Sequence, residues 1–124
     1  MLIFALALAA PTPLTQTHQR DIACVVELAV VADGQKRGVT AGTDVQANGR
    51  RWAGMVGARI TLESGQPREL VAFAMTEAAK ARQARTGDTN TNTVTVADCA
   101  RQMAAELAMA DAVNAPLPKP VKAQ

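Results

Sequence analysis

The chain has 124 residues and a formal net charge of +2, which predicts one domain with a single core. So small a charge gives no clustered basic surface for phosphates, and the aromatic side chains are two Phe and one Trp, with no Tyr. Nucleic acid is therefore not an expected partner, because binding it requires clustered Lys and Arg or a platform of aromatic rings.

Bulky apolar side chains are scarce. Residues 11–124 contain six Leu, two Ile, twelve Val and one Phe, and much of the remaining apolar content is Ala. Such a proportion is typical of disordered chains only when the net charge is also high. We therefore expect an ordered domain of closely packed Ala-rich helices, with a covalent link that supplements a thin core.

Residues 2–10, LIFALALAA, form an uncharged apolar run that stops at Pro11. As a helix this run would rise about 13 Å, less than half of the hydrocarbon core, so no stable membrane span is expected. Ala7 and Ala9 form the A-x-A pattern that precedes signal-peptidase cleavage. We assign residues 1–10 to a signal peptide cut after Ala9 or Ala10. No Lys or Arg precedes the run, and the alternative is an apolar leading segment of a cytosolic protein.

The first helix is predicted over residues 16–33, where Thr15 or Thr17 can cap its start. It should be the most buried helix, because apolar residues flank a stripe at helical spacing formed by Ile22, Val25, Ala29 and Ala32. Asp33 and Gly34 are expected to end it, before a flexible Gly-rich loop that reaches Gly42.

A second helix is predicted over residues 43–64. Thr43 and Gln46 have the spacing of a capping box, and Asp44 suits the positive end of the helix dipole. One face would carry Val45, Gly49, Trp52, Val56 and Ile60. Each glycine inside this helix lowers its stability by about 1 kcal/mol relative to Ala, so a neighbouring helix packed closely over the glycines would be a reason for their presence.

The third helix is predicted over residues 66–85, with Pro67 at its first position. Its apolar stripe would consist of Leu70, Phe73, Ala74, Ala78 and Ala81. The fourth helix is predicted over residues 95–113, opened by Thr95 and Asp98. Its apolar face would consist of Val96, Cys99, Ala100, Met103, Leu107 and Ala110.

These elements predict an all-α fold in which residues 11–115 form one helical domain. The domain would be a small bundle of about four helices with one disulfide, after the cleaved N-terminal signal peptide. Residues 116–124 contain Pro116, Pro118 and Pro120, so we expect a Pro-rich, mobile tail.

Cys24 and Cys99 are the only cysteines, and both fall on apolar helix faces. Export to the periplasm or the extracellular space would place them where disulfides form, so we expect them to pair. The bond would close a loop of about 75 residues, which the chain-entropy model values at roughly 4.5 kcal/mol. The alternative is a reactive or metal-binding thiol pair, but the sequence has no C-x-x-C and no Cys at ligand spacing from a His.

No catalytic, cofactor-binding or metal-binding residue is predicted. His18, the single histidine, lies three residues before Asp21, which could orient its ring, but acid–base catalysis needs a third group. Ser64, the single serine, lies in LESG rather than G-x-S-x-G, and a hydrolase would need these two residues to meet. We expect a solvated His18 and a Ser64 at a helix end.

Three further patterns fall short of a site. Residues 88–92, DTNTN, resemble the opening of an EF-hand loop, but Thr93 and Cys99 stand where Gly and Glu are needed. The loop of residues 34–42, with Lys36 and Arg37, could hold an anion, but it lacks the order of a phosphate-binding loop. The methionines are spread over three helices and are expected to fill gaps in the core: Met55, Met75, Met103 and Met109.

Segments 19–25, QRDIACV, and 97–103, ADCARQM, lie between the apolar leader and the Pro-rich tail. In this layout the chain resembles small exported two-cysteine helical bacterial proteins of unassigned function. The resemblance implies a disulfide and an exported location, and it brings no functional residues with it.

A single His and a single Ser leave little for catalysis, so we expect neither an enzyme nor a cofactor. The predicted function is that of a periplasmic or secreted accessory protein that acts through its surface on an unknown protein partner. The alternatives are a carrier of a small apolar ligand and a metal-handling protein of the bacterial envelope. The oligomeric state is left open.

Overall fold

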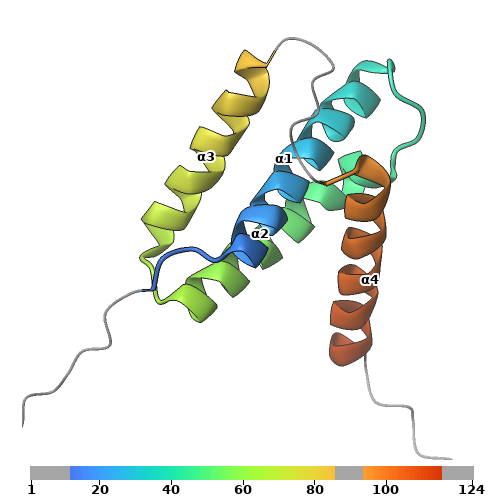
Figure 1. Cartoon of the computed structure of the whole chain (residues 1–124). Coiled ribbons are helices and arrows are strands. Elements are labelled where there is room, and N and C mark those ends of the chain that lie inside the picture. The colour runs from blue at the N-terminus through green and yellow to red at the C-terminus, as the bar shows by residue number, and fades with distance from the viewer. Residues whose placement is uncertain (1–11, 86–93, 116–124) are drawn as a thin grey trace, which may run out of the picture.

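Four α-helices make up the part of the chain that the structure, a computed structural model, describes, namely residues 12–85 and 94–115. They are α1 (Gln16–Arg37), α2 (Asp44–Ser64), α3 (Arg68–Ala84) and α4 (Val96–Asn114), and these ranges contain no strand. α1 and α2 form an antiparallel pair, with α3 on one side and α4 on the other (Figure 1). α3 and α4 each contact the pair and do not contact each other. The predicted all-α fold is confirmed, whereas the signal peptide of residues 1–10 and the tail of residues 116–124 lie outside the described residues and stay predictions.

α1 runs one turn further than its sequence predicts. It continues through Gly34 and ends at Gly38, which adopts the left-handed conformation with a φ of 75°. The Gly34 carbonyl accepts the backbone N–H groups of Val39 at 2.9 Å and Thr40 at 3.1 Å. A Cβ atom on Gly34 would lie 2.3 Å from the Thr40 Oγ1 atom. Gly34 is therefore a point of close approach, where the following loop folds back onto the helix.

The predicted capping box at the start of α2 is wrong. Thr43 makes no side-chain cap, and the Gln46 N–H donates instead to the Oε1 atom of Gln35 at 2.8 Å. The Gln35 Nε2 atom donates to the Ala41 carbonyl at 3.1 Å and to the Asp44 carboxylate at 2.9 Å. This hydrogen bond from Gln35 lowers the pKa of Asp44 below its ordinary value. The last turn of α1 thus caps the first turn of α2 and closes the intervening loop.

The core lies where α1, α2 and α4 meet. Trp52, Val56 and Ile60 are fully buried, and Val45 is nearly so, which confirms the predicted inward face of α2. α1 has more buried residues than any other helix, as predicted, although Ala29 of its expected stripe is exposed. The other three helices and the residue Val94, just before α4, complete this core with Ile22, Cys24, Val26, Leu28, Val71, Val94, Cys99, Met103 and Leu107.

The glycines of α2 are not explained by close helix packing, contrary to the sequence-based expectation. A Cβ atom on Gly54 would meet no atom within 4 Å, and one on Gly57 would meet the end of Met75 of α3 at an ordinary 3.9 Å. The nearest atom to a Cβ on Gly49 belongs to Val45 of the same helix. Nothing in the structure requires glycine at these three positions.

α3 is turned differently from the prediction. Leu70 and Phe73, which were expected to face inward, are 52% and 60% exposed, while Val71 is buried. The helix begins one residue after Pro67, whose carbonyl accepts the N–H groups of Leu70 and Val71. Because most of the inward stripe is Ala, two stripes one position apart are nearly equal in apolarity, and burial of the β-branched Val71 decides between them.

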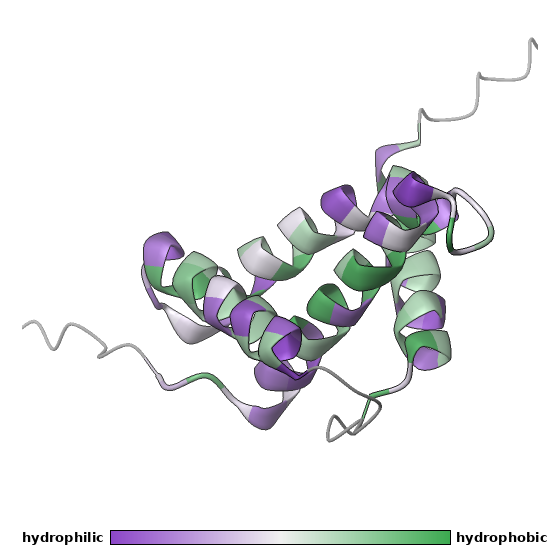
Figure 2. Cartoon of the chain, turned by 90° about the horizontal axis from the view of Figure 1, so that it is seen from above, coloured by the Kyte–Doolittle hydropathy of each residue, from purple (hydrophilic) through white to green (hydrophobic). Residues whose placement is uncertain are grey.

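Every helix carries both polar and apolar residues, as the view from above shows (Figure 2). Within residues 12–85 and 94–115, no helix is both long and apolar enough to cross a lipid bilayer.

The contrast between Gly34 and Gly54 gives a first prediction. Gly34→Ala should lower the free energy of unfolding, because the new methyl group overlaps Thr40, whereas Gly54→Ala should raise it by up to about 1 kcal/mol through helix propensity alone. Urea unfolding followed by circular dichroism measures both. The double variant Gly34→Ala/Thr40→Gly should recover part of the loss, and equal effects of the two single substitutions would contradict this account.

Candidate functional site

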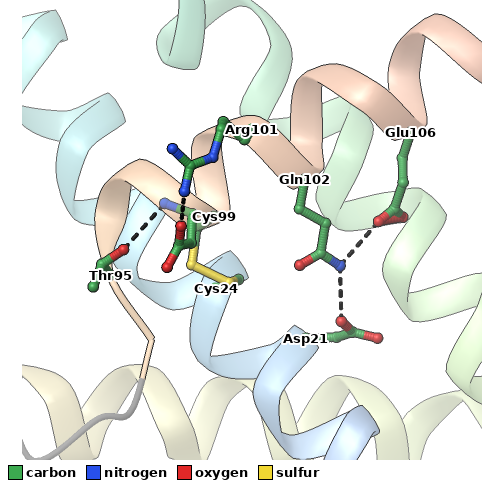
Figure 3. Close-up of a disulfide and its surroundings, with 8 residues drawn as sticks. Asp21, Cys24, Thr95, Cys99, Arg101, Gln102 and Glu106 are labelled. Atoms are coloured by element: carbon green, nitrogen blue, oxygen red, sulfur yellow. Dashed lines mark hydrogen bonds and ion pairs between the residues drawn. A yellow bond between two sulfur atoms is a disulfide. The ribbon is translucent and has the colours of Figure 1, made fainter.

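The predicted pairing of Cys24 and Cys99 is confirmed. Their sulfur atoms are 2.02 Å apart and their Cα atoms 5.2 Å apart, so a disulfide joins α1 to α4 across 75 residues of sequence (Figure 3). Both cysteines are buried, and Cys99 is completely inaccessible. Within residues 12–85 and 94–115 there is no free thiol, which leaves neither cysteine available as a nucleophile or metal ligand.

A polar network, made of Asp21, Trp52, Arg59, Gln102 and Glu106, continues the α1–α4 contact beside the disulfide. The Gln102 Nε2 atom donates to Asp21 on α1 and to Glu106 one turn further along α4, both at 2.9 Å (Figure 3). From α2, Arg59 donates to Asp21 at 3.1 Å and forms an ion pair with Glu106. The indole N–H of Trp52 donates to the same Glu106 oxygen at 3.3 Å. The network therefore links α1, α2 and α4.

The charges in this network stabilise one another. Burial alone would raise the pKa of Glu106, but the hydrogen bonds from Arg59 and Gln102 and the charge of Arg59 lower it below its ordinary value. Burial alone would lower the pKa of Arg59, yet the hydrogen bond and charge of Glu106, with those of Asp21, raise it. Both groups are thus held in their ionised forms, and all of their partners are protein side chains. This network is the polar cluster that sequence reasoning missed.

His18 and Ser64 lie near the same end of the α1–α2 pair but do not form a catalytic pair. His18 is buried rather than solvated as predicted, and its Nε2 atom lies 3.2 Å from Oε1 of Glu63. The Ser64 hydroxyl donates to the Ile60 carbonyl at 2.6 Å and accepts from the Gln66 N–H at 3.1 Å. Ser64 therefore closes the end of α2, where the sequence placed it, and its hydroxyl faces backbone rather than an imidazole.

Among the described residues, the remaining sequence patterns contribute no ligand cluster. Residues 88–92, which resemble the start of an EF-hand loop, lie outside the described residues. Met103 is buried and Met55 and Met75 are partly buried, but Met109 is 69% exposed and does not fill the core as expected. Among residues 12–85 and 94–115, no group of three or more His, Cys, Asp or Glu side chains is placed to hold a metal ion. The N-terminus of α2, which follows the loop of residues 34–42 and was considered as an anion site, is capped by the Gln35 side chain.

A shallow apolar groove, the α1–α3 groove, runs between the two helices and has a volume of about 370 Å³. It is open to solvent because the α3 side of the contact is mostly Ala, and small side chains leave space that larger ones would fill. The residues that line it are Leu14, Gln19, Ile22, Ala23, Val26, Ala74, Ala78, Ala81 and Arg85.

A second surface feature is a set of exposed apolar side chains around the connection between α2 and α3. Leu62, near the end of α2, is 84% exposed, and Leu70 and Phe73 of the first turns of α3 are more than half exposed. We call these three residues the α2–α3 corner. Such exposure is unusual in a chain with so few bulky apolar residues, because each one on the surface is lost from the core.

Comparison with models of protein families, with curated proteins and with solved structures finds no match.

The disulfide gives a second prediction. Reduction of the folded protein should lower its free energy of unfolding by up to roughly 4.5 kcal/mol, because the unfolded chain regains the entropy that a 75-residue loop had removed. Urea unfolding with and without a thiol reductant measures the loss. Cys24→Ala/Cys99→Ala should behave like the reduced protein and should not respond to the reductant. Equal unfolding midpoints for the oxidised and reduced forms would contradict the prediction.

The polar network gives a third prediction, on pH. Because the folded-state pKa of Glu106 lies below its ordinary value of 4.5, its contribution to stability is fully present above that value and is lost as the pH falls through the lower, folded-state pKa. Glu106→Gln should cost about 1–2 kcal/mol near neutral pH, and the difference from the wild type should shrink in acid.

Unfolding measured from pH 7 down to pH 3 tests this prediction. The matched control is Glu77→Gln, which removes a half-exposed carboxylate that pairs with Lys80 on α3. Surface pairs of this kind contribute little, so the control should follow the wild type throughout. A pH-independent gap between Glu106→Gln and the wild type would contradict the proposed role of the charge.

Proposed function

We propose that the protein is an exported, non-catalytic accessory protein that binds a protein partner through its surface. The observation that carries the proposal is the α2–α3 corner, where Leu62, Leu70 and Phe73 are exposed although the core is short of bulky side chains. Exposed apolar groups gathered near one turn are typical of protein-binding surfaces. The disulfide supports export, since such bonds persist in oxidising compartments.

A second candidate function is that of a carrier for a small apolar ligand. The α1–α3 groove supports it, because its volume of about 370 Å³ lies within the range of small-molecule sites and its lining is largely aliphatic. Its openness favours the first proposal, since ligand pockets usually enclose most of their ligand.

The fourth prediction tests the α2–α3 corner. Leu70→Gln/Phe73→Gln should abolish capture of a specific partner from envelope extracts and leave the melting temperature nearly unchanged, because both side chains are more than half exposed. Met109→Gln on α4 is the matched control, since Met109 is also exposed but lies away from the corner. Crosslinking of purified variants in the extract, followed by mass spectrometry, identifies what is lost.

Capture that is unchanged by the corner substitutions would contradict the proposal. Native mass spectrometry of the same purified protein then distinguishes the second candidate. A bound apolar molecule, displaced by Ala78→Leu in the groove but not by Ala104→Leu on the exposed face of α4, would support the carrier.

A further inference from the structure

His18 is a buried titratable group with both ring nitrogens engaged. The backbone N–H of Thr15 points at Nδ1 over 3.2 Å, and an N–H group can only donate. Nδ1 therefore accepts and carries no hydrogen. The ring hydrogen is on Nε2, which donates to Oε1 of Glu63 at 3.2 Å. The geometry assigns His18 to one tautomer of the neutral ring.

This histidine completes the cap of α1. Its own N–H donates to the Thr15 hydroxyl at 3.1 Å while its ring accepts the Thr15 N–H, which is the reciprocal pattern of a capping box. Gln or Glu usually accepts the second of these bonds, and neither side chain takes up a proton near neutral pH, so its acceptor oxygen stays free to bind. Imidazole does take up a proton in that range.

A separate set of hydrogen bonds holds the segment before α1 over the end of α2. The Thr12 N–H and hydroxyl both donate to the Ser64 carbonyl, at 2.9 and 3.1 Å. The Gln66 side chain donates to the Thr12 carbonyl at 2.9 Å. Leu14, between Thr12 and the cap, lines one end of the α1–α3 groove. Loss of the His18 cap would therefore loosen the start of α1 beside that groove, while the bonds of Thr12 still tie the segment to the end of α2.

We propose that His18 is a pH-sensitive clamp that frees the Thr15 N–H and loosens the first turn of α1 when its ring takes up a second proton. Protonation places a hydrogen on Nδ1, so that two donors, Nδ1–H and the Thr15 N–H, face each other. Imidazole is the side chain that ordinarily changes charge between about pH 5 and pH 8. A protonated ring also places positive charge at the helix N-terminus, which the helix dipole disfavours.

Glu63 is the group that opposes release, because its carboxylate attracts the protonated ring. Its side chain is 54% exposed, so solvent screens this attraction, and Nε2 donates to Glu63 in either protonation state. Of the charged neighbours on α1, Asp21 is turned toward Arg59 and Gln102. Within residues 12–85 and 94–115, no ion pair joins the ring to α3 or α4. The protonated ring thus keeps its contact with α2 and loses the cap.

Amide hydrogen exchange of the oxidised protein between pH 7.5 and pH 5.5 tests the clamp. Protection factors, which correct for the intrinsic pH dependence of exchange, should fall roughly fivefold at Thr15 and His18, the size expected for loss of one helix cap. The matched control is His18→Gln, which keeps a capping box that does not titrate, and its protection should stay constant. Equal losses in the two proteins would overturn the proposal.

Nuclear magnetic resonance of the imidazole ring gives a second, independent readout. At pH 7.5 the hydrogen should be on Nε2, and a hydrogen on Nδ1 would overturn the proposal. The pH midpoint of the ring's titration should coincide with the midpoint of the loss of protection at Thr15, in the wild type and in Glu63→Gln alike. Midpoints that differ would show that another group causes the opening and would overturn the clamp.

Discussion

The disulfide between Cys24 and Cys99 is the constraint on which the position of α4 depends. α4 buries only three side chains, Cys99, Met103 and Leu107, and one of these is the cysteine itself. Two apolar side chains contribute too little burial to hold a 19-residue helix against a neighbouring pair. Because the bond joins the middle of α1 to the first turns of α4, it holds the helix beside its partners.

One covalent bond fixes a point of contact but leaves the direction of the helix open. The polar network supplies the direction, since Gln102 and Glu106 meet Asp21, Arg59 and Trp52 progressively further from the disulfide along α4. Buried ion pairs add little net stability, but leaving one unpaired is costly. If α4 were shifted or rotated about the disulfide, Asp21 would lose its hydrogen bond from Gln102, and Glu106 would lose its ion pair with Arg59. The main effect of the network is therefore to select one orientation of α4, and its net contribution to stability is smaller.

The parts of the fold that were predictable from sequence are those set by local spacing. Helical periodicity placed Trp52, Val56 and Ile60 in the core, and the caps at Thr15 and Thr95 follow from side chains three residues or fewer from the groups they bind. The positions of both cysteines on apolar helix faces predicted that they pair. Apart from the cysteine pair, which joins α1 to α4, each of these signals is contained within one helix and needs no distant residue to decide it.

The features that were missed depend on residues far apart in the chain. Gln35 caps α2 from eleven residues upstream, and Gly34 is required by the approach of Thr40 rather than by the end of a helix. The polar network spans up to 81 residues of sequence. A signal for it was present, because Arg59 and Glu106 each adjoin a buried position, Ile60 and Leu107 respectively. Only the arrangement of three helices shows that such flanking charges meet.

The scarcity of bulky apolar residues shapes the surface of the protein, and its effect is greatest at α3. This helix fully buries one residue, Val71, and rests on α1 mainly through alanines. Small contact residues leave the α1–α3 groove open beneath it, while its larger apolar residues, Leu70 and Phe73, face outward. The orientation that buries Val71 leaves Phe73, the largest apolar side chain of α3, 60% exposed. That the helix keeps this ring exposed is the strongest physical reason to look for its partner there.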